Sequence, residues 1–487
     1  MAERTIAIQI GAVSFIDEGT GSVLDTVQSR AGVNTLWLAT PTWNRASGGR
    51  AEPGRPFPDH GKAEYEPDWR GGNYAKVHPE FYRGSVLGPA GRAPEYPDWD
   101  MLEAVIAEAR PRGLKSFAYF DESSHARELR RLPGFQHCLE VDIWNKPARR
   151  PCFNNPDYRN WVLGIVEDYI KSYELDGLAF CSARPGPLDR LLQEPTRQGL
   201  GLIVCFCPHC KARAAERGID WRRAQEGQRK LVLLNAAVSE GNRPPDGVIA
   251  GFWRLLLTYP EIIGWQSLWA DGQHQLYRDI FGTVRSFRPD MKVGWDLYQG
   301  SSFSPFQRAS QNYADLSHIA DFLKISTYHD AGGPRLASFV RNIARAVFGD
   351  ADPTAVYPIL LKMLGLDEGA LDKLPQTGLS ADYVRREVAR ADVGREGRST
   401  VWAGIGIDIP VGEPDAQMAE EVSIGDTPMI DADLTAGPGL VETTPARVSA
   451  AVRAAFAGGA TGIVLGRKYS EMRLDNLSGV KSALADL

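Results

Sequence analysis

Short apolar segments recur along the chain and alternate with longer segments of helical periodicity. Eight of them have the length and residue types of buried strands: 5–11, 34–39, 115–120, 175–181, 291–298, 322–329, 400–409 and 461–467. Helical patterns lie between them at 157–173, 261–287, 334–348, 380–395 and 445–458. Eight strand–helix units favour a closed barrel of parallel strands over an open sheet. The sequence therefore predicts an α/β fold, a (β/α)8 TIM barrel with long βα-loop insertions.

The chain length allows two readings of the domain organisation. A chain of 487 residues is long enough for two or three domains, or for one elaborated barrel. We interpret 1–487 as a single barrel with insertions at about 44–99 and 182–260, because these stretches separate strand candidates far more widely than the others. The apolar stretch 355–364 is interpreted as helical rather than as a ninth strand.

Charge and hydropathy exclude several classes of partner. The net charge is −6 and no long basic run occurs, so a nucleic-acid partner is not expected. No stretch of about 18 apolar residues exists, so no membrane span is expected. The N-terminal sequence lacks the charged region and apolar core of a secretory signal, and we therefore expect a cytoplasmic protein.

The segment TVWAGIGIDIP, residues 400–410, alternates strictly between two faces. Its isoleucines share one face, while Trp402, Gly404, Gly406 and Asp408 share the other. If the isoleucines contact the outer helices, Asp408 points into the barrel mouth, where TIM-barrel active sites lie. A helix cap or an ion pair is the alternative role for Asp408, although the following Ile-Pro makes a cap weak.

The same alternation predicts an inward polar cluster on two other strands. Asp296 shares a face with Gly294, whose small size suits the crowded barrel axis. Lys324, Ser326, Tyr328 and Asp330 share a polar face that would be costly against the helices. A buried Lys324 needs a carboxylate partner. His329, beside Tyr328, is a candidate for binding hydroxyl groups or is a packed, hydrogen-bonded histidine.

Other strand ends supply further candidates with structural alternatives. Glu471 follows the last strand, but Arg467, Lys468 and Arg473 could hold it in an ion pair. One of the adjacent acids Asp121 and Glu122 could face the site, and the other could cap a helix. The candidates for contact with substrate are Tyr328, His329, Lys324, Arg184, Trp295, Asp121, Glu122 and Arg467, and those for catalysis are Asp296, Asp408 and Glu471.

The segment CFCPHC places Cys205, Cys207 and Cys210 within six residues. Thiolates this close suggest a structural zinc site, with a fourth ligand from Cys138, Cys152, Cys181 or His209. Packed thiols without metal are the alternative. No dinucleotide-binding glycine motif, P-loop, HExxH or GxSxG motif occurs, which disfavours nucleotide cofactors and serine hydrolysis.

Several of these segments resemble barrel glycoside hydrolases. CFCPHCKARAAERGI resembles the cysteine-cluster segment of thermophile-type β-galactosidases, in which that cluster holds a structural zinc. CFNNPDYRNWVLGIVEDYIKSYELDGLAF resembles hypothetical glycosyl hydrolases related to α-L-fucosidases, and DFLKISTYHDAGGPR and GRKYSEMR are similar to segments of the same group. The resemblance implies a TIM-barrel glycoside hydrolase, and it places Asp408 where the β-galactosidases have their nucleophile.

One position departs from the β-galactosidase pattern. Strand four of that group ends in Asn-Glu, which supplies the catalytic acid, whereas here it ends in Phe180-Cys181-Ser182. The usual acid therefore cannot be transferred to this chain.

The sequence as a whole favours a glycosidase that cleaves a small glycoside or oligosaccharide by carboxylate acid/base catalysis, with no cofactor required for the reaction. A homo-oligomer is a further candidate assembly. Two alternatives stay open. One is a metal-dependent sugar isomerase, epimerase or lyase, with Asp296, His329 and Glu471 as metal ligands. The other is a carbohydrate-binding barrel without catalysis, which the missing strand-four acid suggests.

Overall fold

A computed structural model describes residues 4–43, 48–50, 58–64, 66, 68–122, 129–182, 184–193, 203–349, 351–407, 441–466 and 468–487. Eight parallel strands form a closed barrel in the order β1-β10-β9-β8-β7-β6-β3-β2. Their bounds are β1 Thr5–Ile10, β2 Thr35–Thr42, β3 Lys115–Asp121, β6 Gly177–Cys181, β7 Lys292–Leu297, β8 Phe322–Ser326, β9 Thr400–Gly406 and β10 Gly462–Gly466. The predicted TIM barrel is therefore confirmed. Each of the eight predicted segments overlaps one strand of the barrel, although β2 and β3 run beyond the predicted ends, to Thr42 and Asp121.

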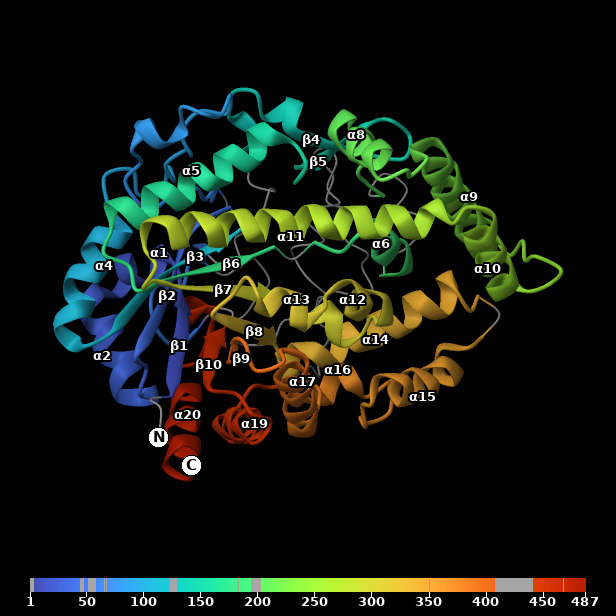
Figure 1. The fold of residues 1–487 in the computed structure, drawn as a ribbon. Helices are drawn as coiled ribbons and strands as arrows, with labels where there is room; N and C mark the ends of the chain where they lie inside the picture. Colours follow the sequence, from blue (N-terminus) through green and yellow to red (C-terminus); the bar gives the residue numbers. More distant parts are fainter. Residues whose placement is uncertain are drawn as a thin grey trace.

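Helices surround the barrel and extend beyond it (Figure 1). Their bounds are α1 Ala12–Glu18, α2 Thr20–Ala31, α4 Met101–Ala109, α5 Pro156–Ser172, α6 Pro187–Gln193, α8 Pro208–Glu216, α9 Trp221–Ser239, α10 Val248–Thr258, α11 Glu261–Phe287, α12 Pro305–Ser310, α13 Tyr313–Ser317, α14 His329–Ala346, α15 Pro353–Leu364, α16 Leu374–Thr377, α17 Ala381–Gly394, α19 Pro445–Ala457 and α20 Asn476–Ala485. Short 3-10 turns lie at Pro79–Tyr82, Arg110–Arg112, Leu129–Arg131, Phe135–Cys138, Gln299–Ser302 and Tyr469–Glu471. A two-stranded antiparallel sheet of β4 (Leu139–Val141) and β5 (Pro147–Pro151) is added after β3.

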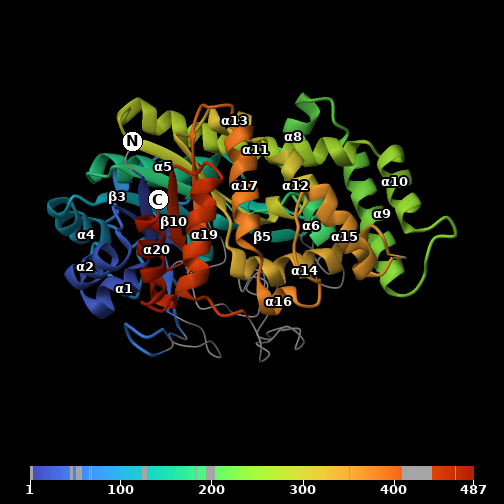
Figure 2. The same ribbon diagram turned by 90° about the horizontal axis from the view of Figure 1, so that it is seen from below.

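The first and last strands pair with each other and close the barrel. Thr5 lies opposite Gly462 and Ile8 opposite Leu465, in parallel register. This pairing brings the two ends of the chain to one side of the barrel, as Figures 1 and 2 both show. No described helix is long and apolar enough to cross a bilayer.

Aromatic side chains fill the inside of the barrel. Phe322 stacks on Trp402 with ring centroids 3.8 Å apart, and Trp37 stacks on Tyr119 at 5.3 Å. Glycines on the inward positions make room for large neighbours. A Cβ on Gly294 would lie 2.2 Å from the Phe322 ring, and one on Gly404 would lie 2.6 Å from Lys324 Cε. Of the two inward glycines predicted in the segment 400–406, Gly404 is thus required by a side chain that crosses the barrel axis, whereas a Cβ on Gly406 would lie 3.6 Å from Tyr328, an ordinary contact.

The stretch from 182 to 260 leads away from the strands. It contains α6, α8, α9 and α10, and α11 then returns to the barrel over 27 residues, about 40 Å at helical rise. Figure 1 shows α9 and α10 at the end of the molecule farthest from the strands, with α15 at the same end.

The predicted boundary between the strand at 322–329 and the helix after it differs from the structure. The strand predicted at 322–329 ends at Ser326, and α14 begins at His329, five residues before the predicted start at 334. Gly332 and Gly333 lie within this helix. A Cβ on Gly333 would lie 2.1 Å from the Leu374 carbonyl oxygen, so glycine is needed there for close helix packing. The stretch 355–364 is helical, as predicted.

Candidate active site

Four neighbouring strands bring polar side chains into one row at the C-terminal end of the barrel. Asp121 on β3 lies opposite Cys181 on β6, Cys181 opposite Asp296 on β7, and Asp296 opposite Lys324 on β8. All four are buried. Because residues in register on parallel strands point to the same face, these side chains meet at the barrel mouth.

Asp296 is held by three donors from two strands, β8 and β3. Its Oδ1 accepts hydrogen bonds from Lys324 Nζ at 2.6 Å and Ser326 Oγ at 3.1 Å. Its Oδ2 accepts one from the Tyr119 hydroxyl at 3.1 Å. A carboxylate has about four acceptor positions, so the bonds from described residues leave one position on Oδ2. Asp296 is therefore both fixed in orientation and able to accept one more proton donor.

Lys324 links Asp296 to Tyr328. Its Nζ donates to the Tyr328 hydroxyl at 2.6 Å as well as to Asp296. Burial works to lower the pKa of Lys324, but the neighbouring Asp296 charge and Tyr328 outweigh it and raise the pKa above its ordinary value. The lysine is accordingly a permanent cation, and it has the carboxylate partner that its predicted burial required.

Cys181 occupies the place between the two carboxylates. Burial raises the pKa of this thiol, and the charges of Asp296 and Asp121 raise it further. A neutral thiol is a poor nucleophile and a poor acid, so Cys181 separates Asp121 from Asp296 without replacing the missing strand-four carboxylate.

Tyr119 and Ser326 were not among the predicted site residues, although both contact Asp296. Ser326 was predicted only to lie on the inward polar face. Burial raises the pKa of Tyr119, followed by the effect of Cys181 and Asp296, so Tyr119 remains a hydrogen-bond donor. Its position two residues before Asp121, on the same face of β3, is the signal that could have identified it.

Glu122 and Arg184, both predicted to contact substrate, are bonded to each other in the interior. Arg184 Nη2 donates to Glu122 Oε1, which also accepts from the Tyr158 hydroxyl, and Ser182 Oγ donates to Oε2 at 3.0 Å. Arg184 also donates to the Pro151 carbonyl at 2.6 Å and lies over the Phe153 ring. This network ties the β4–β5 sheet and α5 to the ends of β3 and β6, which is a structural role for both charges.

The prediction that Trp295 contacts substrate is corrected by its position on the helix-facing side of β7. Its ring stacks on Tyr277 of α11 with centroids 4.5 Å apart, and the side chain is fully buried. Its neighbour in sequence, Asp296, takes the inward face, so alternation along the strand excludes Trp295 from the mouth.

His329 begins α14 and is 2% exposed. Among the described residues neither ring nitrogen has a hydrogen-bond partner. Burial lowers the pKa of His329, so the ring is neutral at physiological pH. The next residue, Asp330, is fully engaged, because it accepts from Thr443 Oγ1 at 2.8 Å and from Arg447 Nε at 2.7 Å. His329 Nε2 lies 3.5 Å from Asp330 Oδ1 without a hydrogen bond, so among the described residues both ring nitrogens keep hydrogen-bonding capacity.

Glu471 lies beyond β10 and forms an ion pair with Lys468 at 3.0 Å. Lys468 is fully buried and also donates to the Gly49 carbonyl at 2.8 Å. This is one of the ion-pair partners expected from the sequence. In the barrel order β10 lies three strands from β7, the strand that carries Asp296.

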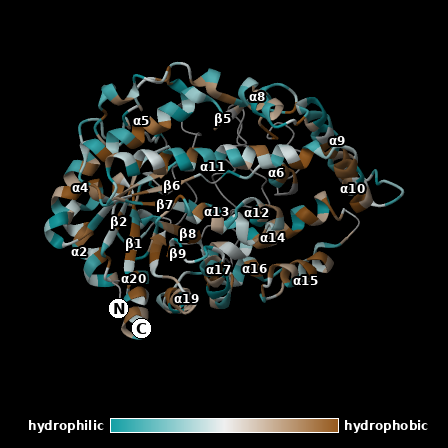
Figure 3. Cartoon of the chain, viewed as in Figure 1, coloured by the Kyte–Doolittle hydropathy of each residue, from teal (hydrophilic) through white to brown (hydrophobic). Residues whose placement is uncertain are grey.

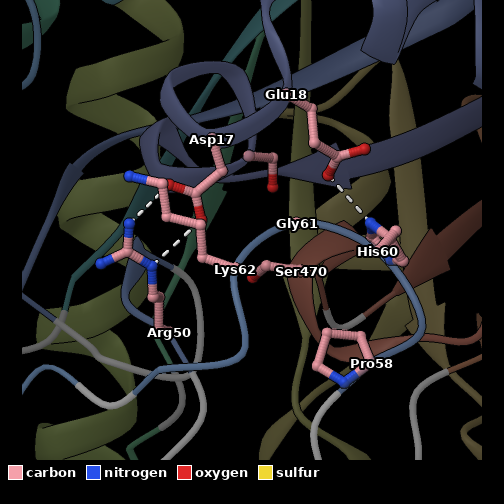
Figure 4. A pocket seen from close by; sticks show the side chains of 9 residues that line it. Asp17, Glu18, Arg50, Pro58, His60, Gly61, Lys62 and Ser470 are labelled. Atoms are coloured by element: carbon pink, nitrogen blue, oxygen red, sulfur yellow. Dashed lines mark hydrogen bonds and ion pairs between the residues drawn. The ribbon is translucent and has the colours of Figure 1, made fainter.

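Next to Glu471 is a small polar pocket formed by α1, the segments at 50 and 58–62, and Ser470 (Figure 4). Asp17 binds Arg50, with Nε 3.0 Å from Oδ2, and Glu18 binds His60 Nδ1 at 2.8 Å. The hydroxyls of Ser14 and Ser470 are buried and have no partner among the described residues. The pocket therefore offers two unused hydroxyls beside two paired carboxylates.

Two predicted site residues, Asp408 and Arg467, lie outside the described residues. Ile407 is the last described residue after β9, and its backbone N–H donates to the Gly466 carbonyl at 3.0 Å.

Four buried cysteines converge beside the β4–β5 sheet. Cys152, Cys205, Cys207 and Cys210 have sulfur atoms within 4.8 Å of one another, with Cys152 Sγ 3.4 Å from Cys210 Sγ and 3.6 Å from Cys207 Sγ. Zinc–sulfur bonds of about 2.3 Å in a tetrahedron place sulfurs about 3.8 Å apart, so the group has the size of a zinc site. The fourth cysteine is Cys152, one of the four residues considered from the sequence.

Hydrogen bonds around the four cysteines suit thiolates. Backbone N–H groups of Val141 and Asn154 donate to Cys205 and Cys152 at 3.4 and 3.3 Å, and Asn154 Nδ2 donates to Cys210 Sγ at 3.3 Å. Hydrogen bonding with Cys152 lowers the pKa of Cys207, as do Cys205 and Cys210, whereas burial raises the pKa of Cys205. Such donors orient and stabilise metal-bound thiolates, so these residues fit a structural zinc.

Elsewhere in the described part of the chain, no other group of three or more His, Cys, Asp or Glu side chains converges for metal binding. Asp296, His329 and Glu471 in particular do not come together. The geometry therefore gives no support to the metal-dependent isomerase or lyase alternative.

No protein-family model matches the sequence, and no curated protein matches it. Solved structures do share the fold. The β-galactosidase of Rahnella sp. R3 has a TM-score of 0.51 at 12% identity, over 100% of this chain and 56% of its own. Those of Marinomonas ef1 and Halorubrum lacusprofundi each have a TM-score of 0.50, at 10% and 13% identity, over 99% of this chain and 59% and 57% of theirs. This chain thus spans little more than half of these β-galactosidases and shares with them the TIM-barrel fold that the sequence resemblance predicted.

Proposed function

We propose that this chain is a glycoside hydrolase acting on a small glycoside or oligosaccharide. The observation that carries the proposal is Asp296, a carboxylate held in an ion pair at the barrel mouth with one acceptor position left for a proton donor. Hydrolysis of a glycosidic bond needs one ionised carboxylate and one protonated acid. We assign Asp296 as the ionised member.

Asp121, Asp408 and Glu471 are the three candidates for the second carboxylate. Asp121 is the described candidate, two strands from Asp296 and on the same inward face. Two strand spacings are about 9–10 Å between Cα atoms, and inward side chains converge from there. That spacing is compatible with the separation of about 6.5–9.5 Å that admits a water between the two groups in inverting enzymes. Asp408 and Glu471 remain candidates from the sequence.

Sugar contacts are proposed for groups with unused hydrogen-bonding capacity. His329 and the hydroxyls of Ser14 and Ser470 have such capacity among the described residues. Tyr328, 8% exposed, is positioned by Lys324 beside the candidate carboxylate. Sugar hydroxyls donate and accept, so neutral side chains of this kind suit them.

The test is turnover of a panel of aryl glycosides by the wild type, Asp296→Asn and Asp121→Asn, with thermal unfolding to confirm folding. We expect a folded Asp296→Asn variant to lose about 10²–10⁴-fold in kcat/KM, because removal of a positioned acid or base costs that much. Wild-type activity in that variant would overturn the assignment.

Two other outcomes would replace the proposal. Sugar binding without turnover across the whole panel would favour the carbohydrate-binding barrel. Activity lost to EDTA and restored by Mn²⁺ would favour the metal-dependent alternative. NMR detection of the product anomer that is released first distinguishes an inverting from a retaining mechanism.

A further inference from the structure

Exposed apolar side chains gather at the end of the molecule farthest from the barrel. Thirteen large hydrophobic residues are exposed in the described part of the chain, and seven of them lie on α9, α10, α15 or the first turn of α11. These seven are Leu233, Ile249, Trp253, Leu257, Ile263, Ile359 and Met363. Figure 1 places these elements together at one end, and Figure 3 shows the hydrophobic colouring of α10 and α15 there. We call this group the distal apolar patch.

Helix α10 has two parallel apolar stripes. Val248, Phe252 and Leu256 are buried against the rest of the molecule. The second stripe is one residue further along and is exposed, with Ile249 at 42%, Trp253 at 55% and Leu257 at 80%. Arg254 and Thr258 are the only polar residues in the helix. A helix that is apolar on nearly all sides is typical of a buried helix, so the exposed stripe needs a covering surface.

Helix α15 shows the same arrangement. Leu360, Leu361 and Leu364 are buried, whereas Ile359 and Met363, four residues apart, are 62% and 67% exposed. Two helices at one end of the molecule therefore each present an exposed apolar stripe.

We propose that the distal apolar patch is the interface of a homodimer in which α10 packs antiparallel against α10 of a second copy. The exposed stripe is symmetric about Trp253, with Ile249 four residues before it and Leu257 four residues after it. A twofold axis through Trp253 would therefore bring each Ile249 opposite the Leu257 of the other copy. Such self-complementarity is what a twofold interface requires, since residue i must meet j and j must meet i.

The exposed apolar area of the patch is most of the area that each partner buries in a stable dimer. At their fractional exposures the seven side chains present roughly 600 Å² per chain, if a large apolar side chain presents about 150–200 Å² when fully exposed. A standard interface buries about 800 Å² per partner, of which the rim is polar. The patch therefore supplies most of the apolar centre, and the surrounding polar residues supply the rest.

Charge around α10 favours a protein partner over a lipid surface. Helices that lie on membranes carry several unpaired lysines or arginines on their polar face. Here Arg254 is paired with Asp246, and Lys230 on the neighbouring α9 is paired with Glu226 at 3.0 Å. The cations beside the stripe are thus neutralised by acids of the same chain.

The first test is the mass in solution, measured by light scattering and sedimentation velocity over a range of protein concentrations. We expect the wild type to be a dimer at micromolar concentration. Leu257→Asp and Trp253→Asp should raise the dissociation constant at least about tenfold, because burying an unpaired carboxylate at the centre of an interface is costly.

Val393→Asp is the matched control. Val393 lies on α17 and is 80% exposed, as Leu257 is, but it lies outside the patch. Its substitution should leave the dimer unchanged. A monomeric wild type at about 100 µM would overturn the proposal, and so would an equal effect of Val393→Asp and Leu257→Asp. A monomer that sediments with anionic phospholipid vesicles would instead assign the patch to a membrane surface.

Cross-linking with a short bis-maleimide tests the geometry without disrupting the fold. Trp253→Cys should cross-link to itself across the twofold axis. Ile249→Cys and Leu257→Cys should cross-link efficiently when the two variants are mixed, and much less when each is alone. Equal cross-linking of all combinations would overturn the antiparallel arrangement.

Discussion

Lys324 and Asp296 form a buried ion pair across the neighbouring strands β8 and β7, with Nζ 2.6 Å from Oδ1. Their side chains are 1% and 6% exposed. Water cannot replace either partner at such burial, so each charge depends on the other and on the bonds from Ser326 and Tyr119.

Removal of the lysine alone should therefore lower the free energy of unfolding more than removal of both charges. We expect Lys324→Met to lower the free energy of unfolding by about 3–5 kcal/mol, because it leaves an uncompensated buried carboxylate. The double variant Lys324→Met/Asp296→Asn should recover part of that loss, since no charge is then left unpaired. Denaturant unfolding of the single and double variants measures the coupling, and additive losses would contradict it.

The four-cysteine group should bind one zinc ion per chain. Purified protein should contain about one equivalent by elemental analysis, and Cys152→Ser should lose most of it, because Cys152 completes the tetrahedral set. Removal of the metal should lower the melting temperature, since metal binding contributes to folding. Cys138→Ser is the control: Cys138 is buried but outside the group, so its variant should keep the metal. Metal-free wild-type protein with unchanged stability would contradict the prediction.

The barrel could be predicted from the sequence because its signals are local. Apolar alternation selects the inward face of each strand, and it correctly placed Asp296 and Lys324 on that face. The inward glycines predicted the crowded axis for the same reason.

The partners of the site residues could not be predicted, because they depend on contacts between distant segments. Glu122 and Arg184 are 62 residues apart, and nothing local indicates that they bond to each other rather than to a ligand. The start of α14 was missed because the close packing of Gly333 against Leu374, which suits a glycine within the helix, is a contact between distant segments. Cys152 lies 53 residues before Cys205, and only the fold distinguishes it from the other candidate ligands.

Asp408 is the residue on which the sequence argument depends most, and it lies outside the described residues. It follows the last described residue of a strand region whose inward positions are Trp402, Gly404 and Gly406. We expect Asp408→Asn to abolish turnover while the melting temperature changes little. Steady-state kinetics and thermal unfolding of the same preparation measure the turnover and the melting temperature. Wild-type activity in this variant would show that Asp408 is not a catalytic residue.

Asp189 on α6 should make stability depend on pH. Burial raises its pKa from 3.8 to about 6, although Ser304 Oγ at 3.2 Å, the Gly186 backbone and Gln266 Nε2 at 3.2 Å work to lower it. The folded state therefore binds a proton more tightly than the unfolded state. The contribution of Asp189 to the free energy of unfolding is fully present below about pH 4 and is lost as the pH rises through about 6. A shift of about two units corresponds to roughly 3 kcal/mol.

Asp189→Asn should remove this dependence. The amide oxygen can still accept from Gln266 and the amide nitrogen can donate to Ser304, while no charge is buried at neutral pH. Melting temperatures measured between pH 4 and 7 should fall less steeply with rising pH in the variant, and at pH 7 the variant should be the more stable protein. Asp290→Asn, whose side chain is 78% exposed, should keep the wild-type slope. The same slope in Asp189→Asn as in the wild type would show that Asp189 titrates at its ordinary pKa.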